Sequence, residues 1–337
     1  MMKDLLQKLV AGKNLSTAEA VAAFDRIMDG EATPAQLGAF LAALRIKGET
    51  IEELTGACAS MRRHAVFIDP RGKQVVDTCG TGGDALGTFN ISTTAAFVVA
   101  GAGVPVAKHG NRSITSKCGS ADVLAELGVN LEVSPDVMEE CIHEVGIGFL
   151  FAPKLHPAMK HAMGPRRELG FRTIFNLLGP LANPAGARCQ VLGVFAPELT
   201  EMFAEVLKHL GSQRVFVVHG QDGMDEITVT GTTRISELRD GTIRTYNFDP
   251  LAVIGDYAGL STLAGGDPKQ NAVITRSILE GEKGPRRDIV CLNAAAGLIA
   301  GGKAMDFPDG FRLAQKTLDS GAAMKALEGL VAKTRGQ

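Results

Sequence analysis

The chain has 337 residues, 45% of them hydrophobic, so we expect two domains, or one large domain with an appendage, rather than a disordered protein. Its 35 Lys and Arg residues against 37 Asp and Glu residues give a net charge of −2, which argues against a protein whose whole surface binds nucleic acid. The six cysteines form no C-x-x-C pair, so neither a zinc site nor a disulfide framework is expected. The sequence has no signal-peptide pattern and no apolar run long enough to span a bilayer, so we expect a cytoplasmic protein with no membrane partner.

Residues 1–70 are predicted to form a small helical domain. Three segments in this region each place a Ser or Thr hydroxyl three residues before Glu or Gln, which is the capping-box pattern that starts a helix. The three pairs are Ser16 with Glu19, Thr33 with Gln36, and Thr50 with Glu53. Apolar residues follow each box at helical spacing, but no segment carries an evident reactive group. A later helical stretch, at about 165–187, is expected to join this domain.

Residues 71–337 are predicted to form a larger α/β domain with a mainly parallel central sheet, because short apolar strands alternate there with helices. The predicted strands are Val75–Asp77, Val104–Ala107, Ile147–Phe151, Val191–Phe195 and Val215–His219. The predicted helices are Ile91–Ala102, Ser120–Leu127, Pro135–Glu144 and Pro197–Leu210, with others from Asp288 onward. Residues 228–248 are predicted to be short strands and turns. Because ligands bind at the carboxyl ends of parallel strands, the loops after Asp77, Ala107 and His219 are expected to form one site.

The first of these loops is the glycine-rich turn Gly80-Thr81-Gly82-Gly83-Asp84. Glycines leave backbone N–H groups open to an approaching anion, which suits a phosphate or pyrophosphate, although many such turns bind nothing. A helix predicted to start near Asn90 would aim its free N–H groups at the same place, with the Ser92 and Thr93 hydroxyls beside them. The alternative is an ordinary helix cap without a ligand.

The second loop, from Lys108 to Ser120, concentrates hydrogen-bond donors between a predicted strand and a predicted helix. Lys108 supplies a positive charge and Asn111 an amide, so the loop is a candidate anion site; a solvated surface loop is the alternative. Further along, the neighbours Arg166 and Arg167 offer a bidentate contact for a substrate carboxylate. Only one of them can face a given site, because adjacent residues on a helix do not point the same way.

The third loop contains two adjacent carboxylates, Asp225 and Glu226, soon after a predicted core strand. Such a pair suits Mg²⁺, which often lies between protein carboxylates and substrate phosphates. An exposed acidic turn is the alternative, but a cation would relieve the cost of holding two negative charges together. The sequence therefore predicts an enzyme that binds a phosphate-rich substrate together with a metal ion.

Taken together, these motifs resemble the anthranilate phosphoribosyltransferase family of tryptophan biosynthesis. The resemblance runs from the helical N-terminus to the final helices. Besides the loops above, it includes Asn90-Ile91-Ser92-Thr93, Gly119-Ser120-Ala121-Asp122, His156-Pro157-Ala158-Met159 and the run from Arg172 to Leu181. It implies the fold shared by nucleoside phosphorylases and this class of phosphoribosyltransferases. It also implies transfer of the phosphoribosyl group from 5-phosphoribosyl 1-pyrophosphate (PRPP) to the amine of anthranilate, a requirement for Mg²⁺, and a homodimer.

The resemblance implies roles for individual residues as well. The implied PRPP ligands are Gly80, Thr81, Gly83, Asp84, Thr88, Asn90, Ser92, Thr93, Lys108 and Ser120. Those implied for anthranilate are Gly80, Asn111 and Arg166, and those implied for the metal are Ser92, Asp225 and Glu226. No residue is assigned as a general acid or base, because the aryl amine is already a neutral nucleophile. Pro165 departs from the family pattern, in which a small aliphatic residue precedes the arginine, so the choice between Arg166 and Arg167 stays open.

Two other functions share this fold class. A pyrimidine nucleoside phosphorylase would have a related lysine loop, but its usual signature lacks the Asp-Glu pair. A nucleic-acid-binding relative would show a basic groove and eroded metal ligands, whereas here the ligands are intact and the net charge is slightly negative. Both alternatives therefore rank below the phosphoribosyltransferase.

Overall fold

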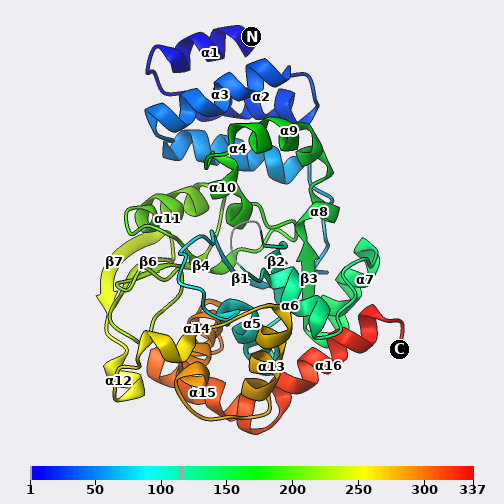
Figure 1. The fold of residues 1–337 in the computed structure, drawn as a ribbon, viewed down its shortest axis with the longest axis vertical. Helices are drawn as coiled ribbons and strands as arrows, with labels where there is room; N and C mark the ends of the chain where they lie inside the picture. The colour runs from blue at the N-terminus through cyan, green and yellow to red at the C-terminus, as the bar shows by residue number, and fades with distance from the viewer. Residues whose placement is uncertain (1, 114–116) are drawn as a thin grey trace.

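The computed structural model describes residues 2–113 and 117–337, which form a helical unit and a larger α/β unit (Figure 1). The helical unit, at the top of that view, contains the N-terminal helices α1 (Met2–Val10), α2 (Thr17–Met28), α3 (Pro34–Lys47) and α4 (Ile51–Arg63). A later part of the chain returns to this unit, because α9 (Lys160–Leu169) contacts α2 and α3, and α10 (Phe175–Leu178) contacts α4.

The three predicted capping boxes form, one at the start of each of α2, α3 and α4. In the third box, the side chain of Glu53 also accepts a hydrogen bond from the backbone N–H of Leu15 at 2.9 Å. The same carboxylate pairs with Lys47 at 2.9 Å and is 1% exposed. This buried group therefore ties the start of α4 both to the loop before α2 and to the end of α3.

A seven-stranded sheet forms the centre of the α/β unit, with the order β3-β2-β1-β4-β5-β6-β7. The first five strands in that order are parallel, and β6 and β7 add an antiparallel edge. The strands are β1 (Val76–Gly80), β2 (Val106–Gly110), β3 (Ile147–Phe151), β4 (Cys189–Gly193), β5 (Arg214–Gly220), β6 (Thr233–Arg239) and β7 (Thr242–Phe248). The chain passes from β1 outward to β3, then resumes at β4 on the other side of β1. The winding direction thus reverses between β1 and β4, and such switch points bind ligands.

Helices cover both faces of this sheet (Figure 1). One face packs against α5 (Ile91–Gly101) and α14 (Pro285–Ala300), and the other against α11 (Leu199–His209) and the helical unit. Alternate residues of β5 show this division. Phe216 and Val218 belong to the core under α5 and α14, whereas Val215 and Val217 belong to the core shared with the helical unit. Strands buried on both faces require the continuous apolar runs seen in the sequence.

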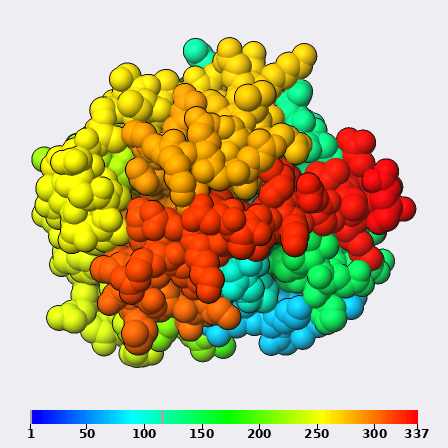
Figure 2. All heavy atoms as spheres, turned by 90° about the horizontal axis from the view of Figure 1, so that it is seen from below, coloured from blue at the N-terminus to red at the C-terminus, as the bar shows by residue number. Residues whose placement is uncertain are grey.

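The remaining elements lie around this centre. They are the helices α6 (Ser120–Glu126), α7 (Pro135–Glu140), α8 (Ala152–Leu155), α12 (Leu251–Ile254), α13 (Pro268–Leu279), α15 (Phe307–Asp319) and α16 (Ala322–Thr334), the 3₁₀ turns Pro157–Met159, Gly179–Leu181 and Leu260–Leu263, and the π-helix Cys141–Val145. Seen from below, the gold to red segments of the last part of the chain cover most of the molecule's face (Figure 2). Within the described ranges, no helix combines the length and the apolar character needed to span a membrane.

Residues 228–248 are more regular than the sequence pattern predicted. They contain the hairpin formed by β6 and β7, each seven residues long. Asp240 and Gly241 connect the two strands, and both have positive φ, at 51° and 77°. Two-residue hairpin turns of this kind favour Asp-Gly, so this dipeptide was a usable signal for the hairpin.

The helices of the C-terminal part also differ from the predictions. Helix α13 was not predicted, although Asp267 and Gln270 form a capping box like those of the N-terminal helices. The helix predicted from Pro135 to Glu144 forms over nearly those bounds, but only Pro135–Glu140 is α-helix, and the chain continues as a π-helix from Cys141 to Val145. The long closing helix begins at Pro285, slightly before the predicted start, since proline is favoured in the first turn.

Gly56 lies where α4 packs on α2, and a Cβ added there would come within 2.7 Å of the Ala20 Cβ. We expect Gly56→Ala to force the helices apart and lower the free energy of unfolding by about 1–3 kcal/mol. The matched control is Gly38→Ala in α3, where an added Cβ has nothing within 4 Å. There, the better helix propensity of Ala should raise the free energy of unfolding by about 0.5–1 kcal/mol. Urea unfolding measures both, and equal effects would contradict the close contact at Gly56.

Candidate active site

The glycine-rich turn and the acidic loop meet at the carboxyl ends of the central strands. Oδ2 of Asp225 accepts a hydrogen bond from the backbone N–H of Gly82 at 2.8 Å. A Cβ at Gly80 would lie 2.8 Å from the same Oδ2, and a Cβ at Gly193, the last residue of β4, would overlap the carbonyl oxygen of Asp225. Because glycine has no side chain, residues 80 and 193 leave room for Asp225 between β1 and β4, at the switch point of the sheet.

The neighbouring carboxylate contacts the start of α5. Oε1 of Glu226 accepts a hydrogen bond from the backbone N–H of Ser92 at 3.0 Å. The Oγ1 of Thr78, on β1, donates to the carbonyl oxygen of Ser92 at 3.1 Å. Backbone N–H groups at a helix N-terminus attract negative charge, so Glu226 lies at a favourable place for a carboxylate. The structure thus brings together Ser92, Asp225 and Glu226.

Lys108 provides a buried positive charge beside these carboxylates. Its side chain is on β2, only 3% exposed, and its Nζ donates to the carbonyl oxygen of Thr78. Burial lowers the pKa of Lys108, while negative charge acts in the opposite direction, that of Asp77 most strongly and that of Glu226 least. Lys108 in turn acts to lower the pKa of Glu226. The lysine is therefore an electrostatic partner of the acidic loop.

Burial dominates the electrostatics of the acidic loop. Burial first, and the nearby charge of Asp84 second, raise the pKa of Asp225 to about 7. Burial first, and the charge of Asp225 second, raise the pKa of Glu226 to about 8. Carboxyl groups resist ionisation in such surroundings, and Lys108 alone does not offset the effect. A divalent cation would remove much of this cost.

These groups fit a magnesium ion that is shared with a substrate. Mg²⁺ takes oxygen ligands and is commonly bound through one or two carboxylates together with phosphate oxygens. Asp225 and Glu226 supply two carboxylates beside the glycine-rich turn and the start of α5. In the described part of the chain, no group of three or more His, Cys, Asp or Glu side chains is placed to hold a metal by itself. A bound ion would take its further ligands from Ser92, the third predicted metal ligand, and from phosphate oxygens and water.

A second group of predicted residues surrounds the loop between β2 and α6. The Oγ of Ser120 donates to the carbonyl oxygen of Asn111 at 3.3 Å. The Nδ2 of Asn90 donates to the carbonyl oxygen of Cys118 at 3.2 Å. Residues 114–116, part of the predicted donor-rich loop, lie outside the described residues. Asn90, Asn111 and Ser120 are therefore connected through the described ends of this loop.

Two residues that the sequence analysis did not assign support the glycine-rich turn. The Nη2 of Arg172 donates to the carbonyl oxygen of Gly83 at 3.0 Å, and its guanidinium carbon lies 4.3 Å from the ring centre of Phe195. The backbone N–H of Phe195 donates to Oγ1 of Thr81 at 3.1 Å. Arg172 and Phe195 were therefore missed as supports, because nothing in the local sequence indicates that they stack on each other.

The other predicted PRPP ligands differ in exposure. Oδ1 of Asp84 accepts a hydrogen bond from the backbone N–H of Leu86 at 3.2 Å, and Thr88 pairs with Ala264 in an isolated β-bridge. Thr93 is 2% exposed in the first turn of α5. Asp84 and Thr88 are therefore partly exposed in the segment after the glycine-rich turn, whereas Thr93 is buried.

A third supporting residue comes from α13. Asn271 is 1% exposed, and its Nδ2 donates to Oδ1 of Asn90 at 2.9 Å. Its own Oδ1 accepts a hydrogen bond from the backbone N–H of Gly266 at 2.7 Å. Asn271 thus orients a predicted PRPP ligand. It was missed because α13 itself was missed, although the capping box at Asp267 would have located the helix.

The two candidate arginines lie in the helical unit, on α9. The guanidinium carbon of Arg166 is 5.1 Å from the ring centre of Phe175, and burial lowers the pKa of Arg166. Arg167 is exposed. Within the described ranges, no hydrogen bond joins Arg166 to the other predicted residues. Arg166 lies on α9 in the helical unit, whereas Ser92, Asp225 and Glu226 lie in the α/β unit.

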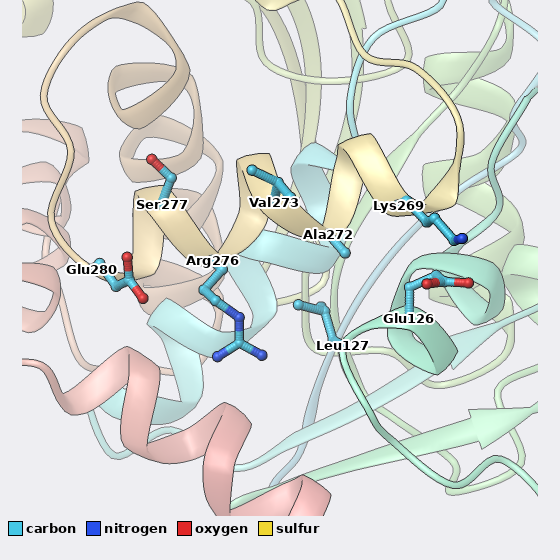
Figure 3. Close-up of a pocket in the computed structure, with 8 residues that line it drawn as sticks. All are labelled: Glu126, Leu127, Lys269, Ala272, Val273, Arg276, Ser277 and Glu280. Carbon is cyan, nitrogen blue, oxygen red and sulfur yellow. The ribbon is translucent and has the colours of Figure 1, made fainter.

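The surface grooves lie apart from the predicted residues. A groove of about 390 Å³ between α6 and α13 is shown in Figure 3. Lys269 and Arg276 line it together with Glu126 and Glu280, so its mixed charges favour neither anions nor cations. A second groove, of about 620 Å³, lies next to the C-terminal residues. None of the residues predicted to bind substrate or metal lines either groove.

Known proteins share both units of the chain. Two family models match, the helical bundle domain of a glycosyl transferase family at residues 3–65 and the α/β domain of such a family at residues 72–324. The anthranilate phosphoribosyltransferase of Syntrophobacter fumaroxidans is 58% identical over 334 residues, 99% of each chain. The crystal structure of that enzyme from Thermus thermophilus matches with a TM-score of 0.93 and 45% identity, over 98% of this chain and 99% of the other. The enzyme from Saccharomyces cerevisiae in complex with PRPP and Mg matches with a TM-score of 0.89 and 27% identity, over 100% and 98%.

The raised pKa values of the acidic loop predict how the metal-free protein responds to pH. Because the folded state holds protons on Asp225 and Glu226 more tightly than the unfolded state does, their contribution to stability is complete only below the ordinary pKa values of 3.8 and 4.5. It falls as the pH rises above them and is lost once the pH passes about 7 and about 8. Asp225→Asn removes one of these charges. We expect it to stabilise the metal-free protein by on the order of 2 kcal/mol more at about pH 9 than at about pH 5. Thermal unfolding in a chelator tests this, and a gain independent of pH would contradict the raised pKa of Asp225.

Proposed function

The chain belongs to the anthranilate phosphoribosyltransferase family, and from this premise we propose that the carboxyl ends of β1, β2 and β5 are its active site. The enzyme transfers the phosphoribosyl group of PRPP to the amine of anthranilate, giving N-(5-phosphoribosyl)anthranilate and pyrophosphate in tryptophan biosynthesis. One observation carries the placement of the site. The carboxylates of Asp225 and Glu226, both partly buried, accept hydrogen bonds from backbone N–H groups of the glycine-rich turn and of the first turn of α5.

The proposed PRPP ligands divide between two anion-binding elements. The turn from Gly80 to Asp84 and the first turn of α5 supply backbone N–H groups for the pyrophosphate. Lys108 adds a positive charge from β2. Asn90 and Ser120, joined through the loop before α6, extend the binding surface toward the rest of the substrate. Fixed dipoles and charges of this kind stabilise the negative charge that develops on a leaving group.

We propose Mg²⁺ as the cofactor, held by Ser92, Asp225, Glu226 and the phosphate oxygens of PRPP. Support comes from the raised pKa values of the two carboxyl groups and from the relative solved with PRPP and Mg. When bound, this ion would act as a Lewis acid that neutralises charge on the pyrophosphate. The protein's own contribution is to hold two carboxylates together where they would otherwise repel each other.

The chemistry requires no strong base on the protein. The bond between C1 of the ribose and the pyrophosphate oxygen breaks, the amine nitrogen of anthranilate forms the new bond to C1, and the amine loses one proton. Since the aryl amine is a neutral nucleophile, catalysis depends on positioning and on stabilising the leaving group. We propose that Asn111 and Arg166 position anthranilate, with the Arg166 guanidinium binding its carboxylate.

Two features remain proposals that rest on the family resemblance. We propose a homodimer, and the exposed Val10 and Ile46 of the helical unit, at 76% and 86%, offer apolar side chains for a second copy to cover. We also propose a cytoplasmic location. The relatives support neither the nucleoside phosphorylase nor the nucleic-acid-binding alternative.

The double substitution Asp225→Asn with Glu226→Gln tests the metal site. Because both charges that attract the cation are removed, we expect turnover at limiting Mg²⁺ to fall by about 100-fold or more. The loss of anthranilate fluorescence on adding PRPP measures the rate. Asp240→Asn, in the exposed hairpin turn, is the matched control and should keep wild-type activity. Turnover unchanged by the double substitution would refute the metal assignment.

Replacing each arginine of α9 decides which one binds anthranilate. Arg166 is partly buried against Phe175, whereas Arg167 is exposed, so only the former is held in a fixed position. We expect Arg166→Ala to raise the KM for anthranilate by about 10-fold or more, because a charged hydrogen bond is lost. Arg167→Ala should leave this KM within about 2-fold. The reverse pattern would assign the role to Arg167.

A further inference from the structure

A buried asparagine of α14 holds the backbone next to the acidic pair. Asn293 is 2% exposed, and its Oδ1 accepts a hydrogen bond from the backbone N–H of Ile227 at 2.9 Å. Its Nδ2 donates to the carbonyl oxygen of Ile227, also at 2.9 Å, and to that of Ile289, one turn earlier on α14. One side chain therefore satisfies both backbone groups of the residue that directly follows Glu226.

Ile227 needs this partner because it lies outside the sheet. It follows β5 and precedes β6, so no neighbouring strand pairs with it, and it is fully buried. A buried backbone N–H or C=O without a partner costs about 1–3 kcal/mol. Asn293 provides both donor and acceptor from a rigid helix. The contact thus fixes the position of Ile227 relative to α14, and with it the direction in which the Glu226 side chain leaves the backbone.

The other side of the acidic loop is fixed independently. Oδ2 of Asp222 accepts hydrogen bonds from the hydroxyls of Thr228 and Thr230 at 2.7 and 2.6 Å, and its Oδ1 accepts one from the backbone N–H of Met224 at 3.1 Å. Asp222 thus closes the loop on itself, but none of these bonds reaches the rest of the fold. The hydrogen bonds of Asn293 do, because they join the loop to a helix that contacts β1, β4 and β5.

We propose that Asn293 is a positioning residue that holds Glu226 in place for the divalent cation used in phosphoribosyl transfer. The inference rests on the proposed function above. Two adjacent, partly buried carboxylates repel each other, and a loop that carries them is free to relax outward unless its backbone is anchored. Without the side chain of Asn293, the backbone N–H and C=O of Ile227 would lose their hydrogen-bond partners and the loop would shift. The hydrogen bond from the backbone N–H of Ser92 to Glu226 would then be lost. Groups that orient a metal ligand in this way commonly change metal affinity 10- to 100-fold when replaced.

The test compares three variants of the full-length protein. Asn293→Ala removes the whole contact. Asn293→Asp keeps the shape and the acceptor for the Ile227 N–H but loses both donated hydrogen bonds. Val290→Ala, on the same helix and fully buried, makes a cavity without touching the hydrogen bonds of the loop, so it is the control for a general loss of stability.

The first measurement is the rise in melting temperature when Mg²⁺ is titrated at a fixed concentration of PRPP. We expect the half-saturating Mg²⁺ concentration to increase by about 10-fold or more in both Asn293 variants and to stay unchanged in Val290→Ala. The second measurement is steady-state kinetics. Turnover of the Asn293 variants should recover at high Mg²⁺, with the KM for anthranilate unchanged.

Each outcome separates the inference from the function on which it rests. If the wild-type protein responds to Mg²⁺ but the Asn293 variants lose only melting temperature and keep the wild-type half-saturation, Asn293 is merely structural and the proposal is overturned. If Asn293→Ala does not fold, the isosteric Asn293→Asp gives the same decision. If the melting temperature and turnover of the wild-type protein ignore Mg²⁺, the proposed metal site itself is wrong.

Discussion

The packing of two neighbouring, partly buried carboxylates at the switch point of the sheet is the constraint on which the site depends. Asp225 and Glu226 accept hydrogen bonds from backbone N–H groups of the glycine-rich turn and of α5. Such N–H groups also suit an external anion. Their burial and the negative charges beside them make it unfavourable for the two carboxyl groups to ionise, which raises the pKa of both. In the proposed function, a phosphate-rich substrate joins them together with a cation that offsets the repulsion. Binding of substrate and binding of metal are therefore coupled in this proposal.

The fold creates this constraint by bringing distant segments together. Gly80 and Gly193 end neighbouring strands, and their lack of side chains makes room for Asp225. The C-terminal helices then support the groups that the earlier strands present. Asn271 on α13 holds Asn90, and Asn293 on α14 holds the backbone beside Glu226. The last part of the chain thus contributes none of the proposed substrate ligands but supports Asn90, which is one of them, and the backbone beside Glu226.

Local signals predicted much of this fold. The capping boxes at Ser16, Thr33 and Thr50 formed as expected, because each depends on residues only three positions apart. The strand Ile147–Phe151 was predicted with its observed bounds, since five consecutive apolar or small residues fit a strand buried on both faces. The misses were failures to use similar signals. The Asp267 box would have located α13, and Asp240-Gly241 would have located the edge hairpin.

The sequence by itself determined the helical and α/β parts, the glycine-rich turn and the acidic pair, because these depend on residue type and short spacing. It also carried the family resemblance that indicates the reaction. Only the tertiary structure decided that Gly82 meets Asp225 and that Ser92 meets Glu226, pairs that lie 143 and 134 positions apart. It also decided which carboxyl groups resist ionisation, and that Asn271 holds Asn90 while Asn293 holds the backbone beside Glu226. Burial and long-range hydrogen bonds arise from how the strands and helices pack, and no short stretch of sequence contains both partners.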